Sequence, residues 1–441
     1  MKKELPIAPE LVRECMTSLH IQDAGNASIR EIVALVNEVE TRSYQRYVRM
    51  EMGVPGLPAA EIGVQAEIEA LKNGVASAYP LIDGISSLKE EAARFIRLFM
   101  NVEVSSQGCV PTVGSMEATW SAFMVCAAMN VEKDTVLFID PGFPVQKQQL
   151  QVLGINYETF DVYDFRGSKL QEKLESYLKK GTICSIVYSN PNNPSWVCLT
   201  EEELAIIGNL SHKYDVVVME DLAYFAMDFR KDLHTPGQAP YQATVARYTN
   251  NYMLFISSSK IFSYAGQRIG MLIISDALFH REYPDLQKRF GCATVGNAVI
   301  FKILYAVSSG TSHSAQYALA AMFRAANEGK FNFIEDVKEY GVKAKIMKRL
   351  FIENNFFIVY DKDGSEKVGD GFYFTVGYPG MTGNELLAEL LYYGISAISL
   401  GNTGSKKEGI RACVSHVQRK QFALLEERLK NFNSDHPLKN E

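Results

Sequence analysis

Short apolar runs alternate with amphipathic stretches between about residue 105 and residue 275. Five runs rich in β-branched and aromatic residues are candidate strands, namely TVLFID, CSIVYS, DVVVME, YMLFIS and GMLIIS. Helical patterns separate most of them, which indicates an α/β layer with a largely parallel sheet. One of these helices has a clear start, because Thr200 followed by Glu203 is a capping box. Ligands of such sheets bind at the carboxyl ends of the strands, so the residues after each run are the candidates for a site.

The pattern changes further along the chain. A long helical region extends to about residue 350, and GFYFTVG, LLAELLYYG, ISAISL and IRACVS then predict a second, smaller α+β lobe. The turn-rich GVPGLP near residue 53 predicts a hinge after an N-terminal helical arm. We therefore expect an N-terminal arm with part of the small domain over residues 1–55. The large domain should follow over 56–329, and the C-terminal part of the small domain over 330–441.

Composition narrows the class of protein. The 441 residues are 47% hydrophobic and 22% charged, with a net charge of -6 and no long basic run, so nucleic acid is not an expected partner. The N-terminal MKKELPIAPELV meets proline and glutamate before a signal-peptide apolar region forms, and the apolar stretch at 123–129 is too short to span a membrane. The seven cysteines lack zinc-site spacing. We expect a cytoplasmic protein with reduced thiols, no metal and no membrane partner.

Polar side chains follow two of the predicted strands. Asp221 comes directly after DVVVME, and Tyr224 lies one turn further on. Ser257 is the last residue of YMLFIS, and Ser258, Ser259 and Lys260 follow it. Taken alone, the first pair indicates an acidic helix N-cap and the second segment a common serine-rich loop. Neither segment identifies a site without the others.

Three further segments carry candidate binding groups. Gly114-Ser115-Met116 precedes an apolar helix, whose N-terminal amides and dipole favour an anion. Phe143 follows TVLFID, where the face of its ring can stack on a flat ligand, and Arg411 lies in the predicted strand IRACVS. Taken alone, these are a helix start, a core phenylalanine and an exposed strand residue.

In their order along the chain, these segments resemble the fold-type I pyridoxal-phosphate enzymes, and more specifically the class I/II aminotransferases of the aspartate aminotransferase superfamily. The resemblance runs from about residue 50 to about residue 415. Tyr79, Gly84 and Leu88-Lys89 are similar to the family's Tyr, Gly and Leu-Arg pattern. NPNNP at residues 190–194 matches the family's Asn-Pro-x-Asn-Pro motif and is the most specific short motif in the chain.

The chain departs from the family pattern at two places. Lys89 stands where the family usually has arginine. Ser195-Trp196 stands where the family continues with Thr-Gly after the Asn-Pro-x-Asn-Pro motif, which changes the wall beside the cofactor.

The resemblance implies a large domain with a mostly parallel sheet covered by helices, a smaller α+β domain, and pyridoxal 5′-phosphate held by Lys260 as a Schiff base. Asp221 would keep the pyridine nitrogen protonated, and Tyr224 and Asn193 would bond the phenolic oxygen. Freed by the substrate amine, Lys260 would then act as the general base at Cα. The other cofactor-binding residues implied are Gly114, Ser115, Met116, Phe143, Ser257, Ser259, Arg268 and, reaching a neighbouring subunit, Tyr79. Substrate would be bound by Arg411, Asn193 and Gly53.

The function that this resemblance implies is transfer of an amino group from an amino acid to a 2-oxo acid by a homodimer, as part of amino acid metabolism. A fold-type I lyase or synthase, such as a C-S β-lyase, is the alternative, because the same framework supports elimination. A regulator with an aminotransferase-like module is less expected, because too few residues precede Tyr79 for a winged helix. The sequence does not identify the amino donor or acceptor.

Overall fold

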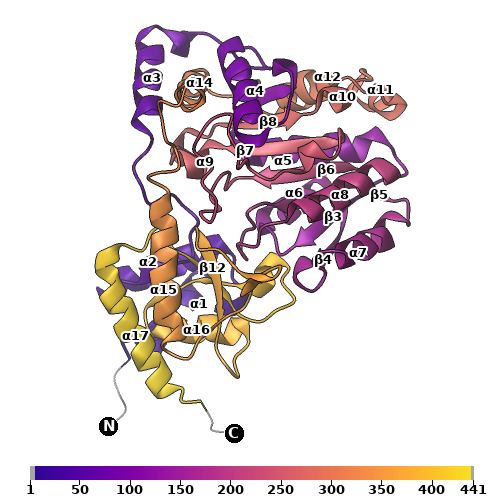
Figure 1. The fold of residues 1–441 in the computed structure, drawn as a ribbon. Helices are drawn as coiled ribbons and strands as arrows, with labels where there is room; N and C mark the ends of the chain where they lie inside the picture. Colours follow the sequence, from indigo (N-terminus) through magenta and orange to yellow (C-terminus); the bar gives the residue numbers. More distant parts are fainter. Residues whose placement is uncertain (1–4, 439–441) are drawn as a thin grey trace. The chain divides into compact units, whose positions relative to one another are not determined.

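The computed structural model of the protein describes residues 5–438 (Figure 1). Residues 1–4, at the start of MKKELPIAPELV, and residues 439–441 lie outside the described residues. Contacts between residues divide the chain into two units. Unit 1 comprises the described residues of Met1–Gly56, Asn193–Val197 and Lys338–Glu441, and unit 2 comprises Leu57–Asn192 and Cys198–Val337.

Unit 2 contains a seven-stranded sheet in the order β2-β8-β7-β6-β5-β3-β4. Its strands are β2 (Cys109–Thr112), β3 (Thr135–Asp140), β4 (Asn156–Asp161), β5 (Ile183–Ser189), β6 (Val217–Leu222), β7 (Tyr252–Ser257) and β8 (Gly270–Ile274). Strand β8 is antiparallel to both of its neighbours, and the other pairs are parallel. The predicted α/β class with a mostly parallel sheet is confirmed.

All five runs predicted to be strands form the strands β3, β5, β6, β7 and β8. Each of these strands is buried along almost its whole length, which explains their continuous apolar sequences. The pattern missed β4, because this edge strand has the polar sequence NYETFD and only its last two residues are buried. It also missed β2, a four-residue strand at the other edge that contains Pro111.

Helices cover the sheet of unit 2 (Figure 1). The longer ones are α3 (Glu61–Lys72), α4 (Ser86–Met100), α5 (Gly114–Met129), α6 (Pro144–Leu153), α7 (Lys169–Leu178), α8 (Glu201–Tyr214), α11 (Pro284–Phe290) and α14 (His313–Asn327). Helix α5 packs against β7 and β8, and its side chains Phe123 and Val125 join a fully buried core with Phe255. Helix α8 begins at the predicted capping box, where Thr200 Oγ1 accepts from the amide of Glu203. The sheet and α5 thus share one buried core.

Unit 1 is a smaller α+β body. Its strands are β1 (Val48–Arg49), β9 (Phe357–Ile358), β10 (Lys362–Asp363), β11 (Glu366–Lys367), β12 (Tyr373–Gly377), β13 (Ile395–Ser396), β14 (Ile398–Ser399) and β15 (Ile410–Cys413). Its helices are α1 (Pro9–Ser18), α2 (Ile29–Ser43), α15 (Lys338–Ile352), α16 (Gly383–Tyr392) and α17 (Phe422–Asp435). Four strands form an antiparallel sheet in the order β14-β15-β12-β9, and α15 and α17 pack side by side (Figure 1). This confirms the predicted α+β character of the C-terminal region.

Candidate active site

Asp221 and Ser257 lie at the carboxyl ends of two adjacent parallel strands of unit 2. The register pairs Asp221 of β6 with Phe255 of β7, two residues before Ser257. Lys260 follows on the one-turn helix α9 (Ser258–Ile261). The predicted acidic and basic groups therefore share one edge of the sheet, which is where an α/β sheet binds its ligands.

Asp221 is a buried carboxylate with both oxygens engaged. The side-chain Nε2 of Gln146 donates to Oδ2 at 2.9 Å, and the amide of Ala223 donates to Oδ1 at 3.0 Å. Burial raises the pKa of Asp221 to about 6, and the positive charge of Lys260 acts in the opposite direction. A buried carboxylate of this kind favours a cationic partner, because an opposite charge offsets the desolvation of its ionised form.

Strand register brings together the candidate phosphate ligands. Gly270, the first residue of β8, pairs with both Thr112 of β2 and Ser257 of β7. The loop before β8, which carries Arg268, therefore lies at the same edge as the segment that follows β2 and opens α5 at Gly114.

The start of α5 and Arg268 form a cradle for an anion. Gly114 has φ of +68°, and a Cβ added there would lie 2.5 Å from Nη2 of Arg268, so the guanidinium sits directly against the glycine backbone. The side chain of Arg268 is exposed, and its Nη1 donates to the carbonyl oxygen of Ala265 at 2.9 Å. Partly exposed Ser115 and Met116 continue the first turn of the helix. Amides at a helix N-terminus beside a guanidinium are suited to a phosphate.

The serines before Lys260 shape their own turn. Ser257 is buried, and its Oγ accepts from the amide of Ser259 at 3.2 Å, which caps α9. Lys260 is partly buried on this helix. The serine hydroxyls and the lysine amine are therefore held on a short, well-defined segment.

Two predicted aromatic ligands are connected to Asp221 through the elements that carry them. Tyr224 is buried and lies one turn after Asp221, and its carbonyl accepts from the amide of Met227 at 3.1 Å. Phe143 directly precedes α6, and Gln146 in the first turn of that helix reaches Asp221. The partly buried Phe143 is thus three residues from a group that contacts the carboxylate.

Unit 1 brings together two predicted substrate ligands. Nη1 of Arg411 donates to Oδ1 of Asn193 at 3.4 Å, and Nη2 of Arg411 donates to the backbone carbonyl oxygen of Glu51. Arg411 is 1% exposed, yet within residues 5–438 its Nε has no hydrogen-bond partner and the residue forms no ion pair. A buried guanidinium without a carboxylate is costly unless it receives an anion, which fits a carboxylate receptor. Gly53 lies close by in the same unit, beside Tyr373.

Tyr79, unlike the buried residues of the candidate site, is highly exposed. It belongs to unit 2, and 92% of its surface is exposed. Its side chain is therefore available to another molecule.

The candidate site residues of unit 2 carry chemical groups that complement those of pyridoxal 5′-phosphate. The Gly114 and Arg268 cradle offers amides and a positive charge to a phosphate, and a side chain at Gly114 would fill it. Asp221 offers a buried carboxylate to a protonated ring nitrogen, and Lys260 offers an amine at the same edge of the sheet. These three features match the anionic, cationic and aldehyde groups of that cofactor.

Sequence reasoning missed Gln146, although it is the side-chain partner of Asp221. Its one signal is its position three residues after Phe143, which places it one turn into a helix whose start lies at the ligand edge of the sheet. Arg281 pairs with Asp215, which precedes β6, and so lies at the opposite edge of the sheet.

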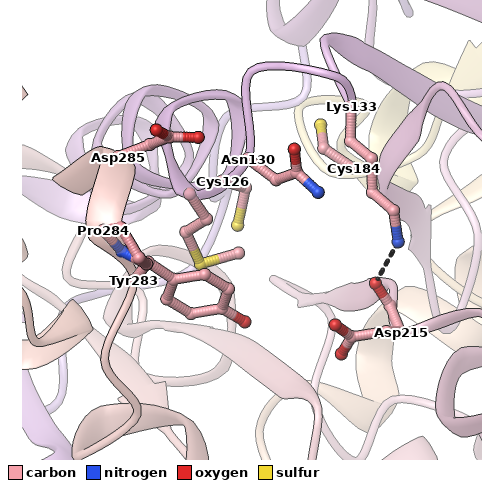
Figure 2. A pocket seen from close by; sticks show the side chains of 9 residues that line it. Cys126, Asn130, Lys133, Cys184, Asp215, Tyr283, Pro284 and Asp285 are labelled. Carbon is pink, nitrogen blue, oxygen red and sulfur yellow. Dashed lines mark hydrogen bonds between the residues drawn. The ribbon is translucent and has the colours of Figure 1, made fainter.

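A cavity of about 350 Å³ also lies at that opposite edge (Figure 2). Lys133 precedes β3, Asp215 precedes β6, and Cys184 is at the start of β5, so the cavity adjoins the amino ends of the parallel strands. Nζ of Lys133 donates to the carbonyl oxygens of Tyr214 and Asp215, both at 2.8 Å. The cavity contains none of the predicted site residues.

Two other kinds of feature are absent from the described part of the chain. Between residues 5 and 438, no helix combines the length and the apolar composition needed to cross a bilayer. The same residues contain no group of three or more His, Cys, Asp and Glu side chains arranged to hold a metal ion.

Comparisons with known proteins assign the class. A family model described as aminotransferase class I and II matches residues 53–429. A probable aspartate aminotransferase of Methanocaldococcus jannaschii is 23% identical over 363 residues, covering 78% of this chain and 90% of that protein. An aspartate aminotransferase of Pyrococcus horikoshii is 22% identical, covering 73% of this chain and 81% of that protein.

Solved structures share the fold at lower identity. The aspartate aminotransferase of Thermotoga maritima has a TM-score of 0.72 at 18% identity, covering 92% of this chain and 97% of that chain. YbdL of Escherichia coli, identified as having a methionine aminotransferase function, has a TM-score of 0.73 at 17% identity. The match covers 93% of this chain and 99% of that chain.

The fold and the family match together define a fold-type I aminotransferase. This chain belongs to the class I and II aminotransferases, because the family model spans most of its length. The protein is an enzyme that transfers an amino group between an amino acid and a 2-oxo acid, and its family depends on pyridoxal phosphate. The resemblance and the activity predicted from the sequence are confirmed.

Proposed function

We propose that the chain binds pyridoxal 5′-phosphate through Lys260 and transfers amino groups with the residues predicted from its sequence. The observation that carries this proposal is the anion cradle of Gly114 and Arg268, which lies at the same sheet edge as Asp221 and Lys260. When bound, the cofactor supplies an electron sink for the electron pair left at Cα after the C-H bond breaks.

Asp221 keeps a proton on the ring nitrogen. Its carboxylate is fixed by Gln146 on one oxygen and by the amide of Ala223 on the other, so it presents a defined edge to a cation. A protonated ring nitrogen beside it lowers the pKa of Asp221 below the value of about 6 that burial produces. Phe143, at the start of the helix that carries Gln146, would stack on the cofactor ring.

Lys260 has two roles in this proposal. Its amine would hold the cofactor, and once freed by the substrate amine it would act as the general base that takes the proton from Cα. Tyr224 and Asn193 would each donate to the phenolic oxygen. In Asn193 the Oδ1 end of the amide faces Arg411, and the Nδ2 end is the donor that a phenolic oxygen needs.

The phosphate is an anchor and takes no part in the chemistry. The amides of Gly114, Ser115 and Met116, the hydroxyls of Ser257 and Ser259 and the guanidinium of Arg268 bind it. Arg411 takes the α-carboxylate of the substrate, because a guanidinium offers two parallel donors to a carboxylate. Gly53 serves the substrate end of the site, where a side chain would collide with Tyr373.

We further propose a homodimer in which Tyr79 reaches the phosphate of the neighbouring subunit. Exposed apolar side chains support this. Tyr79 and Leu81 are exposed on the segment that approaches Gly310, and Phe301 and Tyr305 are exposed on the helical segment that precedes Gly310. A cytoplasmic location remains a prediction from the sequence alone.

The experiment that tests the proposal mixes the purified, cofactor-loaded protein with a panel of amino acids and either 2-oxoglutarate or pyruvate. A new amino acid is the expected product, and ammonia with a 2-oxo acid but no transfer would overturn the proposal in favour of a lyase. Lys260→Ala should abolish both transfer and the visible absorbance of the lysine-bound cofactor. The exposed Lys288→Ala is the matched control, and it should leave both unchanged.

A further inference from the structure

Trp196 has a backbone conformation that favours glycine. It stands where related sequences continue with Thr-Gly after the Asn-Pro-x-Asn-Pro motif, and its φ is +63°. Bulky side chains rarely adopt this left-handed region, so the surrounding structure must hold it. The side chain is only 1% exposed.

Unit 1 contains a space shaped for the indole. A Cβ added to Gly371 would lie 1.9 Å from Cε2 and 2.2 Å from Cζ2 of Trp196, so the ring lies directly on the glycine backbone. Any side chain at position 371 would displace the indole. Trp196 and Gly371 therefore form a complementary pair.

The indole in turn supports the ring beneath Arg411. Trp196 meets Tyr373 edge-on, with ring centroids 6.3 Å apart and planes at 64°. The guanidinium carbon of Arg411 lies 4.7 Å from the centroid of the Tyr373 ring, within range of a cation-π interaction. On another side, a Cβ at Gly53 would lie 1.9 Å from the Tyr373 hydroxyl oxygen. Tyr373 is thus confined, and it confines Arg411.

We propose that Trp196 is a positioning residue that fixes Arg411 through Tyr373 and thereby sets the affinity of the enzyme for the α-carboxylate of its amino donor. The inference rests on the proposed function, in which Arg411 binds that carboxylate. The three side chains are buried, and each is in contact with the next. A shift of the indole is transmitted to the guanidinium, because close-packed groups have no space in which to absorb it.

Trp196→Gly in the cofactor-loaded enzyme tests the proposal. We expect the KM for the amino donor to rise about tenfold, which corresponds to about 1.4 kcal/mol, while kcat and the absorbance maximum of the bound cofactor stay unchanged. Trp196→Phe keeps an aromatic edge against Tyr373 and should restore most of the affinity. The loss should disappear for an amine that lacks the carboxylate but has the same side chain, and only an effect through Arg411 gives that difference.

Gly371→Ala provides a second route to the same displacement. It should raise the KM in the wild-type background and have little further effect when Trp196 is already glycine. Gly401→Ala, in the same unit, is the control, because its added Cβ would meet only Ser399 Oγ at an ordinary 3.7 Å.

Two outcomes would overturn this inference. One is an unchanged KM in both Trp196→Gly and Gly371→Ala, and the other is an equal loss for the amino acid and the matching amine. Absence of transfer activity in the wild-type enzyme would instead contradict the proposed function, so the two failures can be told apart.

Discussion

Gln146 Nε2 donates to Oδ2 of Asp221 at 2.9 Å, and this contact connects the first turn of α6 to the end of β6. The other oxygen accepts from the amide of Ala223, so the plane of the carboxylate is set by one side chain and one backbone group. In the role proposed for Asp221, this fixed orientation would favour cofactor binding, because less ordering remains when the cofactor binds.

Replacing Gln146 should weaken cofactor binding without removing the reactive groups. Gln146→Leu deletes a buried hydrogen bond to a charged group, which is worth roughly 1.5–3 kcal/mol. We expect the Kd for pyridoxal phosphate to rise by about tenfold or more, measured by titration of the apoprotein. Gln151→Leu, at an exposed position on the same helix, should not change the Kd. Equal Kd values for the two variants would show that the contact does not orient Asp221.

The glycine at the start of α5 gives a second prediction. Gly114→Ala places a Cβ 2.5 Å from Nη2 of Arg268 at a residue with φ of +68°. The guanidinium must move away from the phosphate cradle, and we expect cofactor affinity to fall at least tenfold in equilibrium dialysis.

Gly266→Ala is the matched control for the cradle. Gly266 lies two residues before Arg268, and an added Cβ would meet nothing within 4 Å there. The affinity of Gly266→Ala for pyridoxal phosphate should equal that of the wild type. A similar loss of affinity in Gly114→Ala and Gly266→Ala would mean that this region tolerates no substitution.

The parts of this fold that the sequence predicted are those that depend on the local pattern of apolar and polar residues. Buried parallel strands give continuous apolar runs, so the sequence predicted β5, β6 and β7. It thereby also predicted that Asp221 and Lys260 lie where β6 and β7 end. Gln146 was not predictable, because its role depends on α6 approaching β6, a contact between segments 75 residues apart. The support of Arg411 by Tyr373 is likewise a matter of packing between β12 and β15, which sequence spacing does not specify.

Glu220, the neighbour of Asp221 on β6, should make stability depend on pH. It is fully buried and accepts from Thr244 Oγ1, from the amide of Val245 at 3.2 Å and from Tyr188 Oη at 3.3 Å. Burial raises its pKa from 4.5 to about 7, although these hydrogen bonds act in the opposite direction. Between about pH 4.5 and 7 the folded state therefore binds more protons than the unfolded state, and the free energy of unfolding falls as pH rises.

Glu220→Gln removes this titration and should flatten the dependence. Urea denaturation at pH 5 and pH 8, with saturating cofactor, should show a larger fall in unfolding free energy for the wild type, by on the order of 2–3 kcal/mol. The exposed Glu132→Gln should behave like the wild type. Parallel pH profiles for the wild type and Glu220→Gln would contradict the raised pKa.

The exposed apolar side chains of unit 2 give the last prediction. Phe301 is 54% exposed and Tyr79 is 92% exposed, which are high values for large apolar side chains. If these side chains form a subunit interface, Phe301→Asp places an unpaired charge in it, and burying such a charge is unfavourable. Sedimentation should then give about half the mass of the wild type, and cofactor should bind more weakly, because Tyr79 no longer reaches the phosphate of a neighbour.

Val152→Asp is the control for this prediction. It changes an apolar residue of α6 that is 70% exposed and should leave both the sedimentation mass and the cofactor affinity unchanged. A wild-type protein that sediments as a monomer while binding cofactor fully would exclude any need for the partner's Tyr79.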